Sequence, residues 1–137
     1  MKVTILETGA PPTSLHPRFG TYPDMFRRLL GSDYVGDSYD VTKGFLPGDP
    51  QDHPAYLVTG SAAGAYDSLS WIPNLMQFLR EAKGKARLIG ICFGHQIMAE
   101  AFSGRVVKSD KGWGIGKWLG SEARSAVGLN PEGPLAL

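Results

Sequence analysis

The single cysteine of the chain, Cys92, lies between two glycines, directly after an apolar segment. Gly90 and Gly94 stand two residues on either side of it. Because glycine has no Cβ, this G-x-C-x-G spacing is typical of a sharp turn from a strand into a helix that presents a nucleophile. The start of a helix also favours the thiolate, which is the attacking form of cysteine. The pattern therefore predicts that Cys92 is a nucleophile on an elbow, for which Gly90 and Gly94 are structural residues.

A run of small residues at 60–64 follows a second apolar segment, at Ala55–Thr59. In a doubly wound sheet, sites lie beyond the carboxyl ends of the strands, so we expect Gly60 and Ser61 to lie at the same site as Cys92. The backbone N–H groups of Gly60 and Phe93 are the expected donors to the oxyanion of a tetrahedral intermediate.

Gln96 stands four positions after Cys92, one helical turn along, where its amide is expected to bind a polar end of a substrate.

Simpler interpretations exist for each of these features. A lone cysteine after an apolar strand is often a small buried hydrophobe. The run 60–64 is alternatively a plain loop or a phosphate cradle, although it lacks the Lys-Ser/Thr of a P-loop. Trp71 and Trp113 are expected to pack in the core.

The elements that position these residues follow from the apolar pattern. Strands are expected at Val3–Leu6, Tyr39–Thr42, Ala55–Thr59, Arg87–Ile91 and Arg105–Lys108. Helices are expected after Thr21, after Ser70 and over Gln96–Phe102. Strands that alternate with helices predict an α/β fold, a three-layer, doubly wound and mostly parallel sheet with helices on both faces, of flavodoxin-like type.

Two of these helices carry specific signals. Thr21 is a candidate N-cap, and Met25, Phe26, Leu29 and Leu30 are expected on one face of the helix before Gly31 ends it. Ser70 is the candidate N-cap of the second helix, whose residues Ile72, Leu75, Met76 and Leu79 keep the spacing of one buried face.

Length and composition narrow the class of protein. The 137 residues fit one domain. With 42% hydrophobic residues and a net charge of +1, the chain lacks the basic excess of a nucleic-acid-binding domain. No apolar stretch approaches the roughly 20 residues of a membrane span, and the N-terminus does not resemble a signal peptide, so a cytoplasmic protein is expected. One cysteine and three scattered histidines lack the spacing of metal ligands, and no cofactor or metal is expected.

The segment Gly90-x-Cys92-x-Gly94-His95-Gln96 resembles the elbow of the class I glutamine amidotransferases. The likeness covers about residues 1–116, is specific also at Val58–Ser61, and is similar to the stand-alone branch related to the amidotransferase domain of GMP synthase. It implies that Cys92 attacks the glutamine amide to give a γ-glutamyl thioester and ammonia. By the same likeness Gly60 and Phe93 supply the oxyanion donors, and Ser61 and Gln96 bind the substrate.

The family takes its base from a histidine, supported by a glutamate, far beyond the elbow. Residues 117–137 lack this segment and are expected to be an irregular tail, and no histidine follows His95. His53 precedes a strand and is expected at the opposite edge of the sheet. His95 lies on the helix directly after the elbow, and His16 follows the first strand in a loop of unknown course. We therefore expect a C-terminally incomplete domain whose turnover is weak or absent.

Two further functions are compatible with the same residues. A non-catalytic binding or regulatory domain would keep the elbow as scaffold, and a redox-sensing or peptidase-like relative would use Cys92 differently. The expected partner is a small molecule, glutamine or a γ-glutamyl compound. A synthetase or a second copy of the chain is compatible with the pattern, whereas nucleic acid and membrane are not expected.

Overall fold

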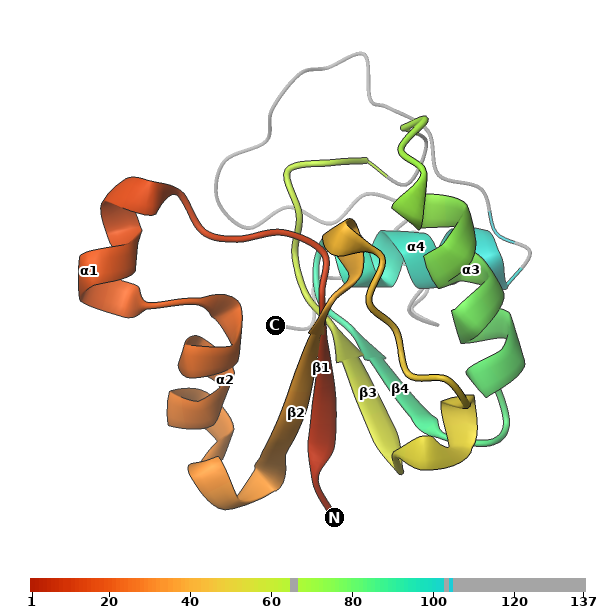
Figure 1. Cartoon of the computed structure of the whole chain (residues 1–137), viewed down its shortest axis with the longest axis horizontal. Helices are drawn as coiled ribbons and strands as arrows, with labels where there is room; N and C mark the ends of the chain where they lie inside the picture. Colours follow the sequence, from red (N-terminus) through yellow and green to blue (C-terminus); the bar gives the residue numbers. More distant parts are fainter. Residues whose placement is uncertain (65–66, 103, 105–137) are drawn as a thin grey trace, which may run out of the picture. The chain divides into compact units, whose positions relative to one another are not determined.

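A computed structural model of the chain describes residues 1–64, 67–102 and 104 (Figure 1). They belong to one compact unit, Met1–Val106. The expected strand at Arg105–Lys108, Trp113, the domain boundary at residue 116 and the 117–137 tail lie outside the described residues.

In the described part of the chain, four parallel strands form the sheet. They are β1 (Val3–Glu7), β2 (Val35–Asp40), β3 (Ala55–Val58) and β4 (Arg87–Gly90), in the order β2-β1-β3-β4. In the register of the sheet, Leu6 lies opposite Val58, and Val58 lies opposite Gly90. The segments that follow β1, β3 and β4 therefore leave the sheet side by side at one edge.

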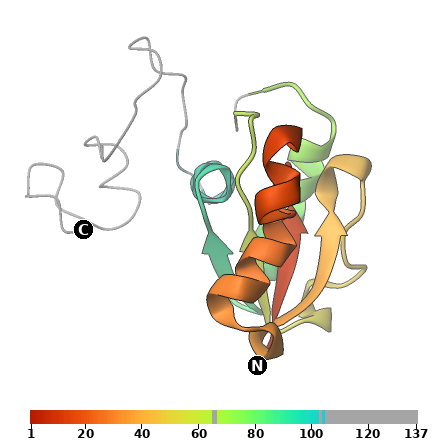
Figure 2. The same cartoon turned by 90° about the vertical axis from the view of Figure 1, so that its left-hand side faces the viewer.

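Helices cover both faces of this sheet, which confirms the doubly wound three-layer fold. The α-helices are α1 (His16–Phe19), α2 (Tyr22–Leu30), α3 (Trp71–Ala82) and α4 (Phe93–Ala101). Short 3-10 helices occur at Thr13–Leu15, Ser32–Tyr34, Val41–Lys43 and Pro50–Asp52. Helix α2 lies on one face, while α3 lies on the opposite face (Figure 2).

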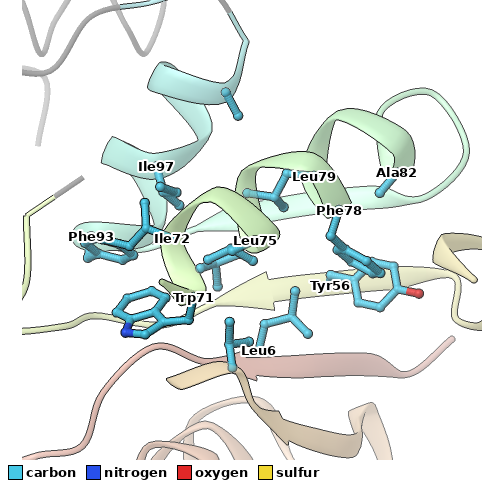
Figure 3. Packing of buried hydrophobic residues seen from close by; sticks show 13 residues of the cluster. Leu6, Tyr56, Trp71, Ile72, Leu75, Phe78, Leu79, Ala82, Phe93 and Ile97 are labelled. Atoms are coloured by element: carbon cyan, nitrogen blue, oxygen red, sulfur yellow. The ribbon is translucent and has the colours of Figure 1, made fainter. Parts of the chain in front are cut away.

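The larger core cluster joins the sheet to α3 and α4. Leu6 and Tyr56 from the strands meet Leu75 of α3 and Ile97 of α4, all of them fully buried (Figure 3). Because side chains alternate along a strand, the neighbouring Ile5 points to the other face, where it packs with Val35 and Leu57, and Phe26 of α2 covers this smaller cluster. The two faces thus have separate apolar cores.

The structure corrects the expected strand at Tyr39–Thr42. The strand is Val35–Asp40, and residues 41–43 form a 3-10 helix. This strand pairs with β1 from Val35 to Asp40 although it contains the weak strand formers Gly36, Asp37 and Ser38. Its pairing comes from backbone hydrogen bonds to β1, which an apolar pattern does not record.

In α2 the N-cap agrees with the sequence better than the apolar face does. Thr21 caps α2 through a capping box with Asp24. Leu29 and Leu30, which belong to the predicted apolar face of α2, are 74% and 40% exposed. The spacing of apolar residues identifies the apolar side of a helix, but it does not show how much of that side the sheet covers. Ser70 stands at the N-cap of α3 but makes no side-chain capping hydrogen bond.

Expected apolar residues of α3 and α4 do pack as the sequence indicates. Ile72, Leu75 and Leu79 are buried, Met76 packs against the same cluster, and Trp71 is a core residue beside Phe93 with ring centroids 5.5 Å apart. None of the helices in the described part of the chain has the length and hydropathy needed to cross a bilayer.

Two carboxylates meet at the carboxyl ends of β1 and β2, where Glu7 lies opposite Asp40. Burial, followed by the charge of Asp40, raises the pKa of Glu7 above its ordinary value of 4.5. Because the pKa of Glu7 is raised in the folded state, protonated Glu7 favours folding and ionised Glu7 disfavours it. The stabilisation is therefore present at low pH and is lost as pH rises through the folded pKa.

We therefore expect Glu7→Gln to raise the melting temperature at neutral pH, with the gain disappearing as pH falls below 4.5. Thermal unfolding followed by circular dichroism across this range measures the effect. The control is Asp37→Asn, which removes an exposed carboxylate of β2. A Glu7→Gln gain that does not depend on pH would contradict the interpretation.

Candidate active site

Cys92 has the backbone conformation of a strained elbow. With φ 54° and ψ −110°, it is the one non-glycine residue in the described ranges with a positive φ. Such a conformation costs roughly 1–3 kcal/mol and persists only when the surroundings impose it. The residue stands at the N-cap position of α4 and is exposed. The sequence prediction of an accessible cysteine between strand and helix agrees with this geometry.

The glycines of the elbow are required by close packing. A Cβ on Gly94 would stand 2.2 Å from the carbonyl oxygen of Val58 in β3. A Cβ on Gly90 would stand 2.6 Å from the carbonyl carbon of Gly94. The first turn of α4 therefore rests directly on the end of β3, and no side chain fits between them.

We expect Gly94→Ala to destabilise the fold by about 3 kcal/mol or more, because its methyl group meets backbone that has no room to move. Gly48→Ala is the matched control, since a Cβ there meets nothing within 4 Å, and it should change the stability by less than about 0.5 kcal/mol. Urea unfolding of both variants measures the difference. Equal stabilities would show that the elbow is looser than the structure indicates.

Gly60 and Cys92 lie next to each other, as the positions of their strands predict. A Cβ built on Gly60 would be 3.8 Å from Cβ of Cys92 and 3.7 Å from the hydroxyl oxygen of Tyr22. The N–H groups of Gly60 and Phe93 donate no hydrogen bond to another described residue. Within the described residues, two amide donors without an acceptor therefore lie on the segments next to Cys92, and an oxyanion requires donors of this kind.

A buried pair of threonines ties the ends of β1 and β3 together beneath this turn. Thr8 N–H donates to Thr59 Oγ1 over 3.0 Å, and Thr8 Oγ1 donates to the carbonyl of Thr59 over 2.8 Å. The hydroxyl of Thr59 in turn donates to the carbonyl of Gly60 over 3.2 Å. Both threonines are almost completely buried.

Sequence reasoning missed Thr8 and Tyr22. A signal for Thr8 was present, because Thr8 follows the first strand directly and the carboxyl ends of β1 and β3 are neighbours. No pattern indicated Tyr22, since its position depends on the path of the chain between β1 and α2.

Ser61 and Gln96, the two predicted substrate-binding residues, lie near the site. The hydroxyl of Ser61 accepts a hydrogen bond from Ala63 N–H over 3.0 Å within its own turn. Gln96 is exposed on α4, one turn after Cys92. Both lie on the segments that carry Gly60 and Cys92, and their substrate contacts stay predictions.

The three histidines occupy different surroundings. His16 Nε2 hydrogen-bonds the carbonyl of Pro11 over 2.8 Å, and His53 Nε2 contacts the Tyr39 hydroxyl over 3.2 Å at the amino end of β3. His95 Nε2 is buried and has no hydrogen-bond partner among the residues that the structure describes. Within residues 1–64, 67–102 and 104, no group of three His, Cys, Asp or Glu side chains is arranged to hold a metal ion.

Comparison with known proteins identifies the family. The profile described as "Glutamine amidotransferase class-I" matches residues 47–125, more than half of the chain. The chain belongs to the class I glutamine amidotransferase family. This match includes Gly60, Cys92 and Gln96, so the resemblance first noted at the elbow extends through the segments that form the site.

Individual relatives agree with this assignment. The chain is 32% identical to a putative glutamine amidotransferase-like protein of Schizosaccharomyces pombe, over 82% of this chain and 52% of the relative. It is 32% identical to gamma-glutamyl peptidase 4 of Arabidopsis thaliana, over 69% of this chain and 39% of the relative. The chain thus spans about half or less of the length of these relatives.

The fold also has a counterpart among crystal structures. A glutamine amidotransferase from Methylobacillus flagellatus superposes with a TM-score of 0.60 and 24% identity, over 80% of this chain and 41% of the other. This likeness confirms the parallel α/β sheet of the described residues.

Proposed function

We propose that Cys92 is the nucleophile in the cleavage of γ-glutamyl amide bonds, with glutamine as the simplest substrate. The observation that carries the proposal is an exposed cysteine held in a strained elbow next to Gly60, with an amide donor on each segment that has no acceptor among the described residues. Family membership supports the substrate class, and the geometry is compatible with the roles proposed for these residues.

The reaction follows from these groups. The Cys92 thiolate attacks the carbonyl carbon of the side-chain amide, and the carbonyl oxygen takes the negative charge beside the N–H groups of Gly60 and Phe93. Collapse of this intermediate breaks the carbon–nitrogen bond, and the nitrogen leaves as ammonia after it takes up a proton. Water then cleaves the γ-glutamyl thioester to give glutamate and the free thiol.

Proton transfer is the weak part of this site. His53 lies at the amino end of β3, whereas Cys92 follows the carboxyl end of β4. His16 Nε2 is bonded within its own loop, and His95 Nε2 is buried. General acid–base help contributes roughly 10²–10⁴-fold, so we infer that the described residues support covalent capture better than turnover.

A γ-glutamyl peptide is the second candidate substrate, because one of the similar proteins is named gamma-glutamyl peptidase 4. Both reactions pass through the same thioester and differ only in the amine that leaves. Incubation with glutamine or with a γ-glutamyl dipeptide, followed by intact-mass measurement after acid quenching, shows which of the two forms the adduct faster.

A redox sensor and a non-catalytic binding domain are each distinguished by a separate measurement. If the chain is a redox sensor, mild peroxide should convert Cys92 to sulfenic acid before any methionine is oxidised. A non-catalytic binding domain requires that Cys92→Ala leaves both stability and partner binding unchanged. A synthetase that consumes ammonia and a second copy of the chain are the partners compatible with the proposal.

We expect a glutamine-like chloromethyl ketone to alkylate Cys92 with saturation kinetics, and free glutamine to protect against it. Intact-mass and peptide mapping locate the label, and Cys92→Ala should remain unlabelled. Iodoacetamide, which has no glutamyl part, should label without saturation. Alkylation by both reagents at equal efficiency, without protection by glutamine, would remove the proposed function.

Gly60→Ala tests whether the space between Cys92 and Tyr22 is where the substrate carbonyl binds. The new methyl group makes ordinary contacts of 3.7–3.8 Å, so the stability should change by less than about 1 kcal/mol. Saturable labelling by the chloromethyl ketone should nevertheless fall at least tenfold, since a displacement of about 1 Å in a reacting geometry costs on the order of 10²-fold. Labelling at the wild-type rate would place the substrate elsewhere.

A further inference from the structure

We propose that Thr8 and Thr59 are positioning residues that aim the backbone N–H of Gly60 at the site of Cys92. This inference rests on the proposed function, because it concerns the oxyanion donor of that reaction. It assigns a role to two buried hydroxyl groups that take no direct part in the proposed reaction.

The orientation of the Gly60 N–H follows from peptide geometry. The described residues contain no cis peptide bond, and in a planar trans peptide the C=O and N–H groups point in opposite directions. The carbonyl of Thr59 and the N–H of Gly60 belong to one such peptide. Whatever holds this carbonyl therefore also sets the direction of the Gly60 N–H.

Thr8 holds that carbonyl from the neighbouring strand. Its Oγ1 donates to Thr59 O over 2.8 Å, and its backbone N–H donates to Thr59 Oγ1 over 3.0 Å. The Thr59 hydroxyl is thereby left to donate to the carbonyl of Gly60 over 3.2 Å. Two successive carbonyl groups of the turn are each held by a hydroxyl, so the peptides on both sides of Gly60 have fixed planes.

Burial makes this arrangement specific. Thr8 is 1% exposed and Thr59 is 0% exposed, so water has no access to replace a missing hydroxyl. Gly9 supports the same turn, because a Cβ there would stand 3.0 Å from the Cα of Ser61 and 3.2 Å from the carbonyl oxygen of Gly60. The end of β1 therefore braces the turn through both hydrogen bonds and close packing.

A strand end does not need this bracing for its own sake, because ordinary strand pairing already joins β1 to β3 through Leu6 and Val58. The additional bonds act one residue beyond the paired segment, on the peptide beside Cys92. An oxyanion donor must be oriented before the charge appears, since reorientation during the reaction costs rate.

The test uses the full chain and the glutamine-like chloromethyl ketone. The thiolate first adds to the ketone carbonyl, and negative charge develops on the ketone oxygen. The sulfur then displaces chloride from the neighbouring carbon, while its bond to the carbonyl carbon breaks and the ketone is restored. Iodoacetamide reacts by direct displacement of iodide, without a tetrahedral oxyanion. The ratio of the two rates therefore reports the orientation of the oxyanion donor, separately from the reactivity of the thiol.

Thr8→Val keeps the shape of the side chain and removes its hydroxyl. We expect the maximal rate of labelling by the chloromethyl ketone to fall about tenfold, part of the roughly 10²–10³-fold that loss of an oxyanion donor costs. The ketone concentration for half-maximal rate and the iodoacetamide rate should each change less than about twofold. Thr8→Ser, which retains the hydroxyl, should restore the maximal rate, and Thr4→Val, another buried threonine of β1, should match the wild type.

A Thr8→Val protein that labels at the wild-type maximal rate would overturn the inference, as would a Thr8→Ser protein as slow as Thr8→Val. If Thr8→Val fails to fold, as judged by circular dichroism, Gly9→Ala provides a second variant that displaces the same turn. It should lower the maximal rate with the ketone but not with iodoacetamide, and an unchanged ratio would overturn the inference. A wild-type chain without saturable labelling would instead overturn the proposed function, and the inference with it.

Discussion

The contact between the first turn of α4 and the end of β3 is the constraint on which the site depends. Because Gly94 lies directly on the carbonyl of Val58, the chain after β4 has to turn back over the sheet within two residues. Cys92 is the residue at that turn and takes a positive φ as a result. The same contact places its Cβ beside Gly60, which continues from Val58 along β3. Position and strain of the cysteine thus have one cause.

The buried clusters offset the energetic cost of this constraint. Phe93 and Ile97 anchor α4 in the same apolar cluster as Leu75 and Leu79 of α3. Burial of such side chains contributes roughly 1.5–3 kcal/mol each, and together these contributions exceed the cost of one strained residue. The elbow is therefore held by packing along the whole helix and does not depend on a local hydrogen bond from the cysteine side chain.

Much of this arrangement was predictable from the sequence, and the reasons differ between elements. The strand before Cys92, the helix after it and the cap at Thr21 each have a local signal, namely an apolar run, a periodic face or a capping residue. The strand Val35–Asp40 has no such signal, because its place depends on pairing with β1. The proximity of Gly60 to Cys92 followed from topology alone, since parallel strands bring their carboxyl ends to one edge. Residues that act across the fold were harder to find. Thr8 and Thr59 are 51 positions apart, and nothing in the immediate sequence of either indicates a bond between them.

The unusual torsions of Cys92 also affect which residues the position tolerates. Side chains branched at Cβ are the least compatible with a positive φ, so threonine, although it carries a hydroxyl nucleophile, is a poorer replacement than serine or glycine at this point. Of the two hydroxyl nucleophiles, only serine is therefore compatible with the positive φ at this position. The backbone of this turn restricts chemical change independently of any selection for activity.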